Sequence, residues 1–117
     1  MCGRYVSATP PDQLARFFGA TSLVEMPGNA EERYVGYYNV APTQGVLTVY
    51  ESSSERLLDR FHWGLVPFWA KDPSIGSKMI NARAETLAEK NSFKRPFATK
   101  RCIISADGFY EWKKVDG

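Results

Sequence analysis

The spacing of apolar residues changes along the chain from helical to strand-like. Near the start, "TPPDQLARFFGA" (residues 9–20) predicts a short helix, because Leu14, Phe17 and Phe18 recur at i, i+3 and i+4 and form one apolar face. Residues typical of helix ends flank it: Thr9 for the N-cap, Pro10 for the first helical position and Gly19 for the C-terminal stop.

The next part of the chain favours strands. Residues 32–44 are rich in aromatic and β-branched side chains and predict a strand that passes into a loop at Pro42. Residues 45–51 alternate apolar and polar positions and predict a second strand, which the turn "SSSE" (52–55) connects to a partner beginning at Arg56. The aromatic residues that follow this partner, with Pro67 among them, are expected to leave regular structure.

The last third of the chain predicts a helix and a hairpin. Residues 81–97 have mostly helical spacing, with a break near Asn91 and Ser92. In residues 101–114, two β-rich runs surround Asp107-Gly108, a dipeptide typical of tight hairpin turns. We find no repeat and no low-complexity linker, so we expect a single domain.

Composition bounds the class of protein. The chain has 117 residues, with 44% hydrophobic and 24% charged, which is typical of one globular domain with a modest core. No apolar run approaches the roughly 20 residues that span a bilayer, and the first residues lack the apolar stretch of a signal peptide. We expect no membrane association and a location in the cytoplasm, at the bacterial nucleoid or, in a eukaryote, the nucleus.

Charge is distributed unevenly. Residues 1–76 contain six Lys and Arg against eight Asp and Glu, whereas residues 77–117 contain nine against five. The net charges are therefore −2 and +4. A basic excess suits a phosphate-facing surface, and an ordinary solvated surface explains it equally well.

The two cysteines are Cys2 and Cys102. A disulfide between them is not expected in a reducing compartment, and with a single histidine they match no zinc spacing. We expect no metal site and no cofactor. Because Cys102 lies in the apolar run "RCIIS", it is expected to be a small buried hydrophobic residue.

Cys2 has a chemical possibility that internal cysteines lack. If Met1 is removed, one residue carries both a free α-amine and a thiol. The amine can attack an aldehyde to give a Schiff base, and the thiol can then close a five-membered thiazolidine ring. The same residue could instead be a nucleophile for amide hydrolysis, or position 2 could have no chemical role.

Several other polar residues could take part in chemistry. Asn81 could orient a substrate oxygen and Arg83 could bind a phosphate, although both also fit a capped helix start with exposed charges. Glu111, among aromatic residues, could be a general acid or base, although an acid near a turn is more often solvent-exposed. His62 is expected to be an ordinary strand residue.

Aromatic residues concentrate in "HWGLVPFWA" (62–70). Trp63, Phe68 and Trp69 lie here close to Gly64 and Pro67. Aromatic side chains on a loop can stack on nucleic-acid bases, and equally often they fill a core.

Six motifs occur together in one order: "MCGRY", "YNVAPTQ", "WGLVPFWA", "INARAET", "SFKRPF" and "CIISADGFYEWKK". In this order the chain resembles the SOS-response-associated peptidase (SRAP) family over its whole length. The resemblance implies an α+β fold of mainly antiparallel strands in a barrel-like core with flanking helices. It also implies binding to single-stranded DNA and a covalent link to abasic sites, whose ring-opened sugar exposes an aldehyde.

The resemblance implies roles for individual residues. Cys2 matches the nucleophile of the family, and Asn81 and Glu111 match its active-site Asn and Glu, the Glu handling proton transfers. Further residues lie in motifs that line the DNA-binding groove: Arg4, Asn39, Pro42, Trp63, Trp69, Arg83 and Thr86. A peptidase that removes residues preceding Cys2, and a non-covalent binder of modified DNA, are the alternative functions.

The resemblance also implies that residues 1–117 are the N-terminal part of a longer SRAP domain. The second half of the family's domain carries an active-site histidine in a "HxRMP"-like motif, which this sequence lacks. His62 does not replace it. A partial sheet with uncovered edges is prone to association, so we expect this chain to self-associate.

Overall fold

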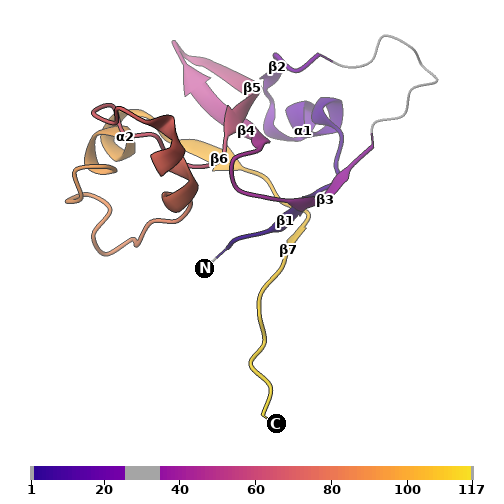
Figure 1. Ribbon diagram of the computed structural model, residues 1–117. Coiled ribbons are helices and arrows are strands. Elements are labelled where there is room, and N and C mark those ends of the chain that lie inside the picture. The colour runs from indigo at the N-terminus through magenta and orange to yellow at the C-terminus, as the bar shows by residue number, and fades with distance from the viewer. Residues whose placement is uncertain (1, 26–34, 117) are drawn as a thin grey trace.

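The computed structural model describes residues 2–25 and 35–116 (Figure 1). The elements are, in chain order, β1 (Tyr5–Ser7), α1 (Pro11–Phe18), β2 (Thr21–Ser22), β3 (Tyr37–Val40), β4 (Gly45–Ser52), β5 (Glu55–His62), a 3₁₀ helix η1 (Pro73–Lys78), α2 (Lys94–Thr99), β6 (Cys102–Ile104) and β7 (Gly108–Phe109).

The strands form two sheets. One has the order β3-β1-β7 and the other has the order β2-β5-β4-β6. Every pairing is antiparallel except β2 with β5, so the predicted α+β class with mainly antiparallel strands is confirmed. Both sheets are open, and no closed barrel forms among the residues that the structure describes.

The longest strands form the predicted hairpin. β4 and β5 pair without interruption from Gly45 opposite His62 to Ser52 opposite Glu55. Ser53 and Ser54 connect them with φ of 51° and 67°, the two positive values that a tight hairpin turn with the right twist requires. The strand position predicted for His62 is therefore confirmed.

Helix α1 covers one face of this hairpin. Leu14 and Ala15 on α1 pack against Leu47, Val49 and Leu58, of which Leu58 is completely buried. Phe17 does not join this core, because its side chain is 82% exposed. The predicted apolar face of the helix is thus wrong at that position.

The ends of α1 were predicted with partial success. Gly19 ends the helix in the left-handed conformation with φ of 63°, as expected. The N-cap is Pro10 rather than Thr9, and Pro11 is the first helical residue. Thr9 fails as a cap because its hydroxyl donates to the Asp107 carboxylate at 2.6 Å instead.

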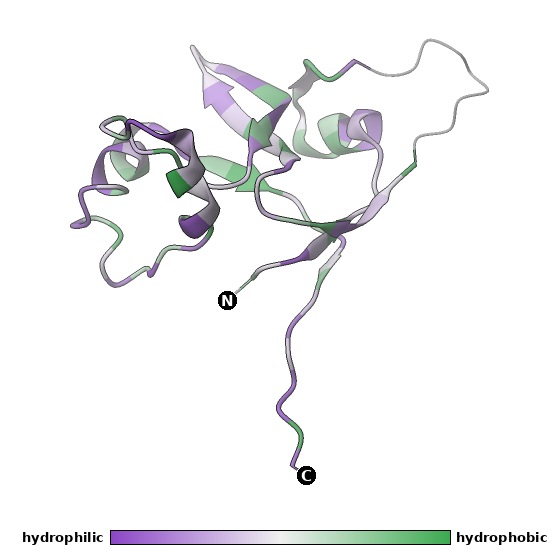
Figure 2. Ribbon diagram, viewed as in Figure 1, coloured by the Kyte–Doolittle hydropathy of each residue, from purple (hydrophilic) through white to green (hydrophobic). Residues whose placement is uncertain are grey.

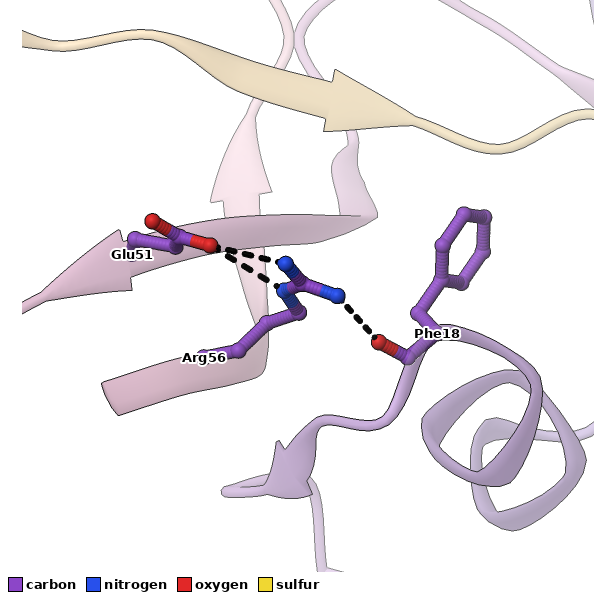
Figure 3. A network of polar contacts seen from close by, with 3 residues as sticks. All are labelled: Phe18, Glu51 and Arg56. Carbon is purple, nitrogen blue, oxygen red and sulfur yellow. Dashed lines mark hydrogen bonds and ion pairs between the residues drawn. The ribbon is translucent and has the colours of Figure 1, made fainter. Parts of the chain in front are cut away.

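A guanidinium joins the hairpin to the helix (Figure 3). Arg56 donates from Nε and Nη2 to the Glu51 carboxylate, at 3.3 and 2.9 Å, and from Nη1 to the carbonyl oxygen of Phe18 at 2.8 Å. Phe18 is the last residue of α1, whose final carbonyl groups have no partner within the helix. Arg56 therefore satisfies this end while it holds the tip of the hairpin.

The predicted hairpin around Asp107 is wrong. β6 pairs with β4 and β7 pairs with β1, so the two runs belong to different sheets. The Asp107 carboxylate accepts hydrogen bonds from the backbone N–H groups of Ala8 and Thr9, at 2.7 and 3.0 Å. These bonds hold the start of β7 beside the end of β1. After β7 the chain runs away from both sheets as an extended segment (Figure 1).

Two further predictions need correction. Residues 81–83 have no regular structure, residues 84–93 form turns and a bend, and only Lys94–Thr99 of the predicted helix is helical, so that helix is mostly absent. Cys102 is exposed rather than buried, because it lies on β6, the edge strand of its sheet, where all three residues are exposed. The strand predicted over 32–44 is confirmed at Tyr37–Val40, while residues 32–34 lie outside the described ranges.

Candidate functional site

Cys2 lies three residues before β1 and is half-buried. The side-chain amide of Asn81 donates from Nδ2 to the carbonyl oxygen of Cys2 at 2.9 Å. Cys2 and Ile80 also pack together against a buried cluster that we call the N-terminal core: Tyr5, Val40, Val46 and Trp63. The structure therefore brings together Cys2 and Asn81, which are 79 positions apart in the sequence.

Trp63 holds the Ile80–Asn81 segment in place. Its indole Nε1 donates to the carbonyl oxygen of Ile80 at 3.2 Å, and its ring packs edge-on against Tyr5, with the ring centroids 5.5 Å apart. Trp63 is 9% exposed, so its position reflects the core-filling alternative for this aromatic residue.

A glycine contact closes the loop between Trp63 and Ile80. Gly64 has φ of 125°, and a Cβ atom there would lie 2.3 Å from the carbonyl oxygen of Gly76. Only glycine fits at such a backbone approach. Leu65 N–H also donates to Met79 O at 3.0 Å. These contacts fix the end of the loop, so that Asn81 reaches Cys2.

The loop after β3 lies beside the same tryptophan. Thr43 N–H donates to Trp63 O at 2.9 Å, and Trp63 N–H donates to Gln44 O at 3.0 Å. Thr43 adopts φ of 74° in the turn that the bond from Gln44 N–H to Ala41 O closes, a conformation that costs an ordinary residue about 1–3 kcal/mol. Pro42 is half-buried in this loop.

Arg4, just before β1, meets Asn39 on the neighbouring strand β3. The Arg4 Nη1 donates to Asn39 Oδ1 at 3.2 Å, and both residues are exposed. This contact places the Arg4 guanidinium, two residues after Cys2 in the chain, beside the side-chain amide of Asn39, where the two groups can meet an anionic ligand.

Glu111 lies just after the strand pair β1–β7. Its neighbour Tyr110 donates from its N–H to Arg4 O at 3.0 Å and from its hydroxyl to Tyr38 O at 2.8 Å. Glu111 is exposed and lies two residues after the end of β7. The backbone of Glu111 is therefore anchored beside the segment that begins with Cys2.

The remaining predicted DNA-binding residues lie apart from this group. Trp69 is 51% exposed and lines a separate hollow of about 310 Å³ with Lys71, Asp72 and Lys78. Arg83 is exposed two residues after Asn81, and its carbonyl oxygen accepts from Thr86 N–H at 3.2 Å. Within the described ranges, neither the N-terminal core nor the hydrogen bonds of Cys2 include Trp69, Arg83 or Thr86.

Asp107 is a residue that sequence reasoning placed only in a turn. The Thr9 hydroxyl and the backbone N–H groups of Thr9 and Ala8 donate to its carboxylate and hold the pKa of Asp107 below its ordinary value. Bonds from Ser74 lower the pKa of Asp72 in the same way. Cys102 is exposed as a residue, but partial desolvation of its thiol raises the pKa of that group. The Asp-Gly dipeptide was the only sequence signal at Asp107, and it pointed to a different structure.

The described ranges contain neither a cluster of metal ligands nor a membrane-spanning helix. No group of three or more His, Cys, Asp or Glu residues there is arranged to hold a metal ion. In the same part of the chain, no helix has the length and apolar character needed to cross a membrane.

The fold and the site define a class: an α+β protein in which an N-terminal Cys is held beside an antiparallel sheet by an Asn side chain. The family model "SOS response associated peptidase (SRAP)" matches residues 1–117. The chain therefore belongs to the SRAP family, and the resemblance in its motifs is confirmed.

Three relatives are similar over nearly the whole chain. Identity is 48% with the abasic site processing protein YoqW of Bacillus subtilis (strain 168), covering 99% of this chain and 50% of YoqW. It is 35% with the abasic site processing protein YedK of Escherichia coli (strain K12), covering 97% and 49%. With the abasic site processing protein HMCES of Rattus norvegicus it is 34%, covering 100% and 38%. The chain spans about half or less of these proteins.

Solved structures share the fold. A protein from Bacteroides thetaiotaomicron superposes with a TM-score of 0.75 at 28% identity, over 98% of this chain and 50% of that one. A protein from Bordetella bronchiseptica superposes with a TM-score of 0.68 at 24% identity, over 94% and 50%.

Proposed function

We propose that this chain is part of an abasic-site processing protein that binds single-stranded DNA and links covalently to abasic sites through Cys2. The observation that carries the proposal is the hydrogen bond from Asn81 to the Cys2 carbonyl oxygen, at 2.9 Å. The bond fixes the backbone of Cys2 and uses neither its amine nor its thiol. The names of the relatives, all abasic site processing proteins, support the choice of substrate.

The chemistry begins with removal of Met1, which frees the α-amine of Cys2. The amine attacks the aldehyde carbon of the ring-opened sugar, and the resulting carbinolamine loses one water to give an imine. Cys2 Sγ then forms a bond to the same carbon, while the thiol proton ends on the nitrogen. The product is a thiazolidine, one water is released, and no oxidant or reductant is needed.

In this proposal the surrounding residues have separate roles. Asn81 orients Cys2, and Glu111 moves protons during loss of water and ring closure. Arg4, Asn39, Pro42, Trp69, Arg83 and Thr86 line the path of the DNA. Trp63 is buried, so it supports the wall of this path through Ile80 rather than stacking on a base.

We further propose that residues 1–117 form the N-terminal part of a single SRAP domain, since they span about half of their relatives. The test of function therefore uses the full-length protein, free of Met1, with single-stranded DNA containing one abasic site. We expect a protein–DNA product that survives a denaturing gel. Cys2→Ala should abolish it, while Cys102→Ala, the matched control at the other cysteine, should leave it unchanged.

A product of equal yield with Cys2→Ala would overturn the proposal. Reversible binding without a covalent product, unaffected by Cys2→Ala, would instead support a non-covalent binder of modified DNA.

A second candidate is a peptidase that acts on its own N-terminus, as the family description suggests. It uses the same residues, with Cys2 exposed by cleavage after Met1. Intact-mass spectrometry tests it: self-processing requires Met1 to be lost in the wild-type protein and retained in Asn81→Ala and Glu111→Gln variants. Loss of Met1 in all three would contradict self-processing.

A further inference from the structure

Asp107 makes three hydrogen bonds to the residues that follow β1. Its Oδ2 accepts from Ala8 N–H at 2.7 Å and Thr9 N–H at 3.0 Å, and its Oδ1 accepts from the Thr9 hydroxyl at 2.6 Å. Hydrogen bonds to a charged acceptor are stronger than neutral ones. The carboxylate thus joins two points of the chain that are almost a hundred residues apart.

The strand pair that begins at this point is very short. β7 has two residues, and they pair Val6 with Gly108 and Tyr5 with Phe109. Tyr110 N–H donates to Arg4 O at 3.0 Å and continues the ladder by one step, while at the other end Asp107 N–H donates to Val6 O at 2.9 Å. A ladder of this length specifies its register weakly by itself.

The register of this pair determines where Glu111 lies. Cys2 precedes β1 by three positions, and Glu111 follows β7 by two. Because side chains alternate between faces of a strand, a slip of one residue would turn the side chains that follow β7 to the opposite face.

We propose that Asp107 is a positioning residue, which fixes β7 in register with β1 and thereby sets Glu111 relative to Cys2. This inference rests on the function proposed above, in which Glu111 transfers protons. The three donors that Asp107 accepts from all lie just beyond β1, so any shift of β7 along β1 breaks them together.

The chemistry of the contact supplies a rescue variant. In Asp107→Asn, the amide oxygen can accept the two backbone N–H groups, and the amide nitrogen can donate to the Thr9 hydroxyl oxygen. Asp107→Asn therefore keeps the register without the charge, whereas Asp107→Ala loses every bond. Thr9→Val removes only the hydroxyl and leaves both backbone donors.

The experiment compares these variants in the full-length protein by the rate of cross-linking to single-stranded DNA with an abasic site. We expect Glu111→Gln to slow the reaction about 10²-fold, as for loss of a general acid or base, and Asp107→Ala to slow it about tenfold or more. Asp107→Asn and Thr9→Val should stay within about threefold of wild type, since they keep both backbone bonds. Reversible DNA binding, measured in a Cys2→Ala background, should change little.

The double variant Asp107→Ala/Glu111→Gln distinguishes positioning from general damage. If Asp107 acts through Glu111, the double variant should react no more slowly than Glu111→Gln alone, because the effects are not additive. Additive losses, or an Asp107→Ala rate equal to wild type, would overturn the proposal.

Hydrogen exchange tests the register independently of activity. In Asp107→Ala the amides of Asp107 and Tyr110 should lose protection while that of Leu58 keeps it, and Asp107→Asn should restore both. Unchanged protection in Asp107→Ala would overturn the positioning role. If the wild-type protein never cross-links, and the variants still differ in exchange as described, the proposed function would be overturned. The register role of Asp107 would then stand.

Discussion

The hydrogen bond from Asn81 to Cys2 restrains the backbone of Cys2 and leaves its thiol out of the bond. The donor binds the Cys2 carbonyl oxygen, and Ile80 packs beside Cys2 on the N-terminal core. The thiol makes only a long contact of 3.9 Å to Arg4 O. In the proposed reaction, this restraint lets the amine and thiol of Cys2 meet one carbon with little loss of entropy.

The lowered pKa of Asp107 predicts a pH dependence of stability. Because the folded-state pKa lies below the unfolded value, the charge stabilises the fold above the unfolded pKa, and this contribution is lost as pH falls through the folded pKa. Wild type should therefore be more stable than Asp107→Asn at pH 7, and the difference should vanish in strong acid. Denaturant unfolding at several pH values measures it. A difference that grows towards acid would contradict the assignment.

Gly64 gives a second prediction at this scale. Gly64→Ala would combine φ of 125° with a Cβ atom 2.3 Å from Gly76 O, so we expect a loss of about 2 kcal/mol or more in the free energy of unfolding. Gly45→Ala is the control, because the nearest atom to its Cβ, on Arg60, is 3.9 Å away. Equal urea midpoints for the two variants would show that the close approach is not required.

Among the elements, those specified by local pattern were predictable. α1 and the β4–β5 hairpin follow from helical spacing, strand alternation and a serine turn, each within fewer than 20 residues. The pairing of β6 and β7 was not predictable in this way. The Asp107-Gly108 dipeptide indicates a hairpin, but hydrogen bonds from Ala8 and Thr9 to Asp107 outweigh that local preference. Such long-range contacts are invisible in a local window of sequence.

The contact between Cys2 and Asn81 could be expected only from the family motifs. Spacing alone favoured a capped helix at Asn81, yet the structure has no regular element there and directs the Asn81 amide to Cys2. The backbone carbonyl of Ile80, which accepts from Trp63, left no signal in the sequence at all. Backbone groups have the same chemistry at every residue, so residue type cannot reveal them.

The core between α1 and the β4–β5 hairpin supports the third prediction. Leu58→Ala should lower the free energy of unfolding by about 3 kcal/mol, since it removes a fully buried side chain and leaves a cavity. Phe17→Ala, on the exposed side of α1, should change it by less than about 0.5 kcal/mol. Urea unfolding monitored by tryptophan fluorescence compares them. A larger effect at Phe17 would place the core elsewhere.

At the scale of the whole molecule, apolar surface remains uncovered. β6 is the edge of its sheet, all its residues are exposed, and Figure 2 shows it as one of the most hydrophobic segments of the ribbon. Trp112 in the extended segment after β7 is fully exposed. Relatives that are about twice as long have further chain with which to cover such surfaces.

The 117-residue chain by itself should therefore self-associate. Light scattering should give a mass above the 13.2 kDa of one chain, and Ile103→Lys should lower that mass, because a charge on an exposed edge strand opposes pairing. Ser77→Lys, an exposed position outside both sheets, is the charge-matched control. A wild-type mass of one chain at high concentration would contradict the prediction.

The central claim is that Cys2 forms the covalent bond to an abasic site. Peptide mass spectrometry of the cross-linked full-length protein, after digestion of both protein and DNA, tests it most directly. We predict a modified peptide that begins at Cys2, lacks Met1, and carries the sugar remnant with the loss of one water. A remnant attached to a lysine such as Lys78, or a cross-linked peptide that still begins with Met1, would contradict the claim.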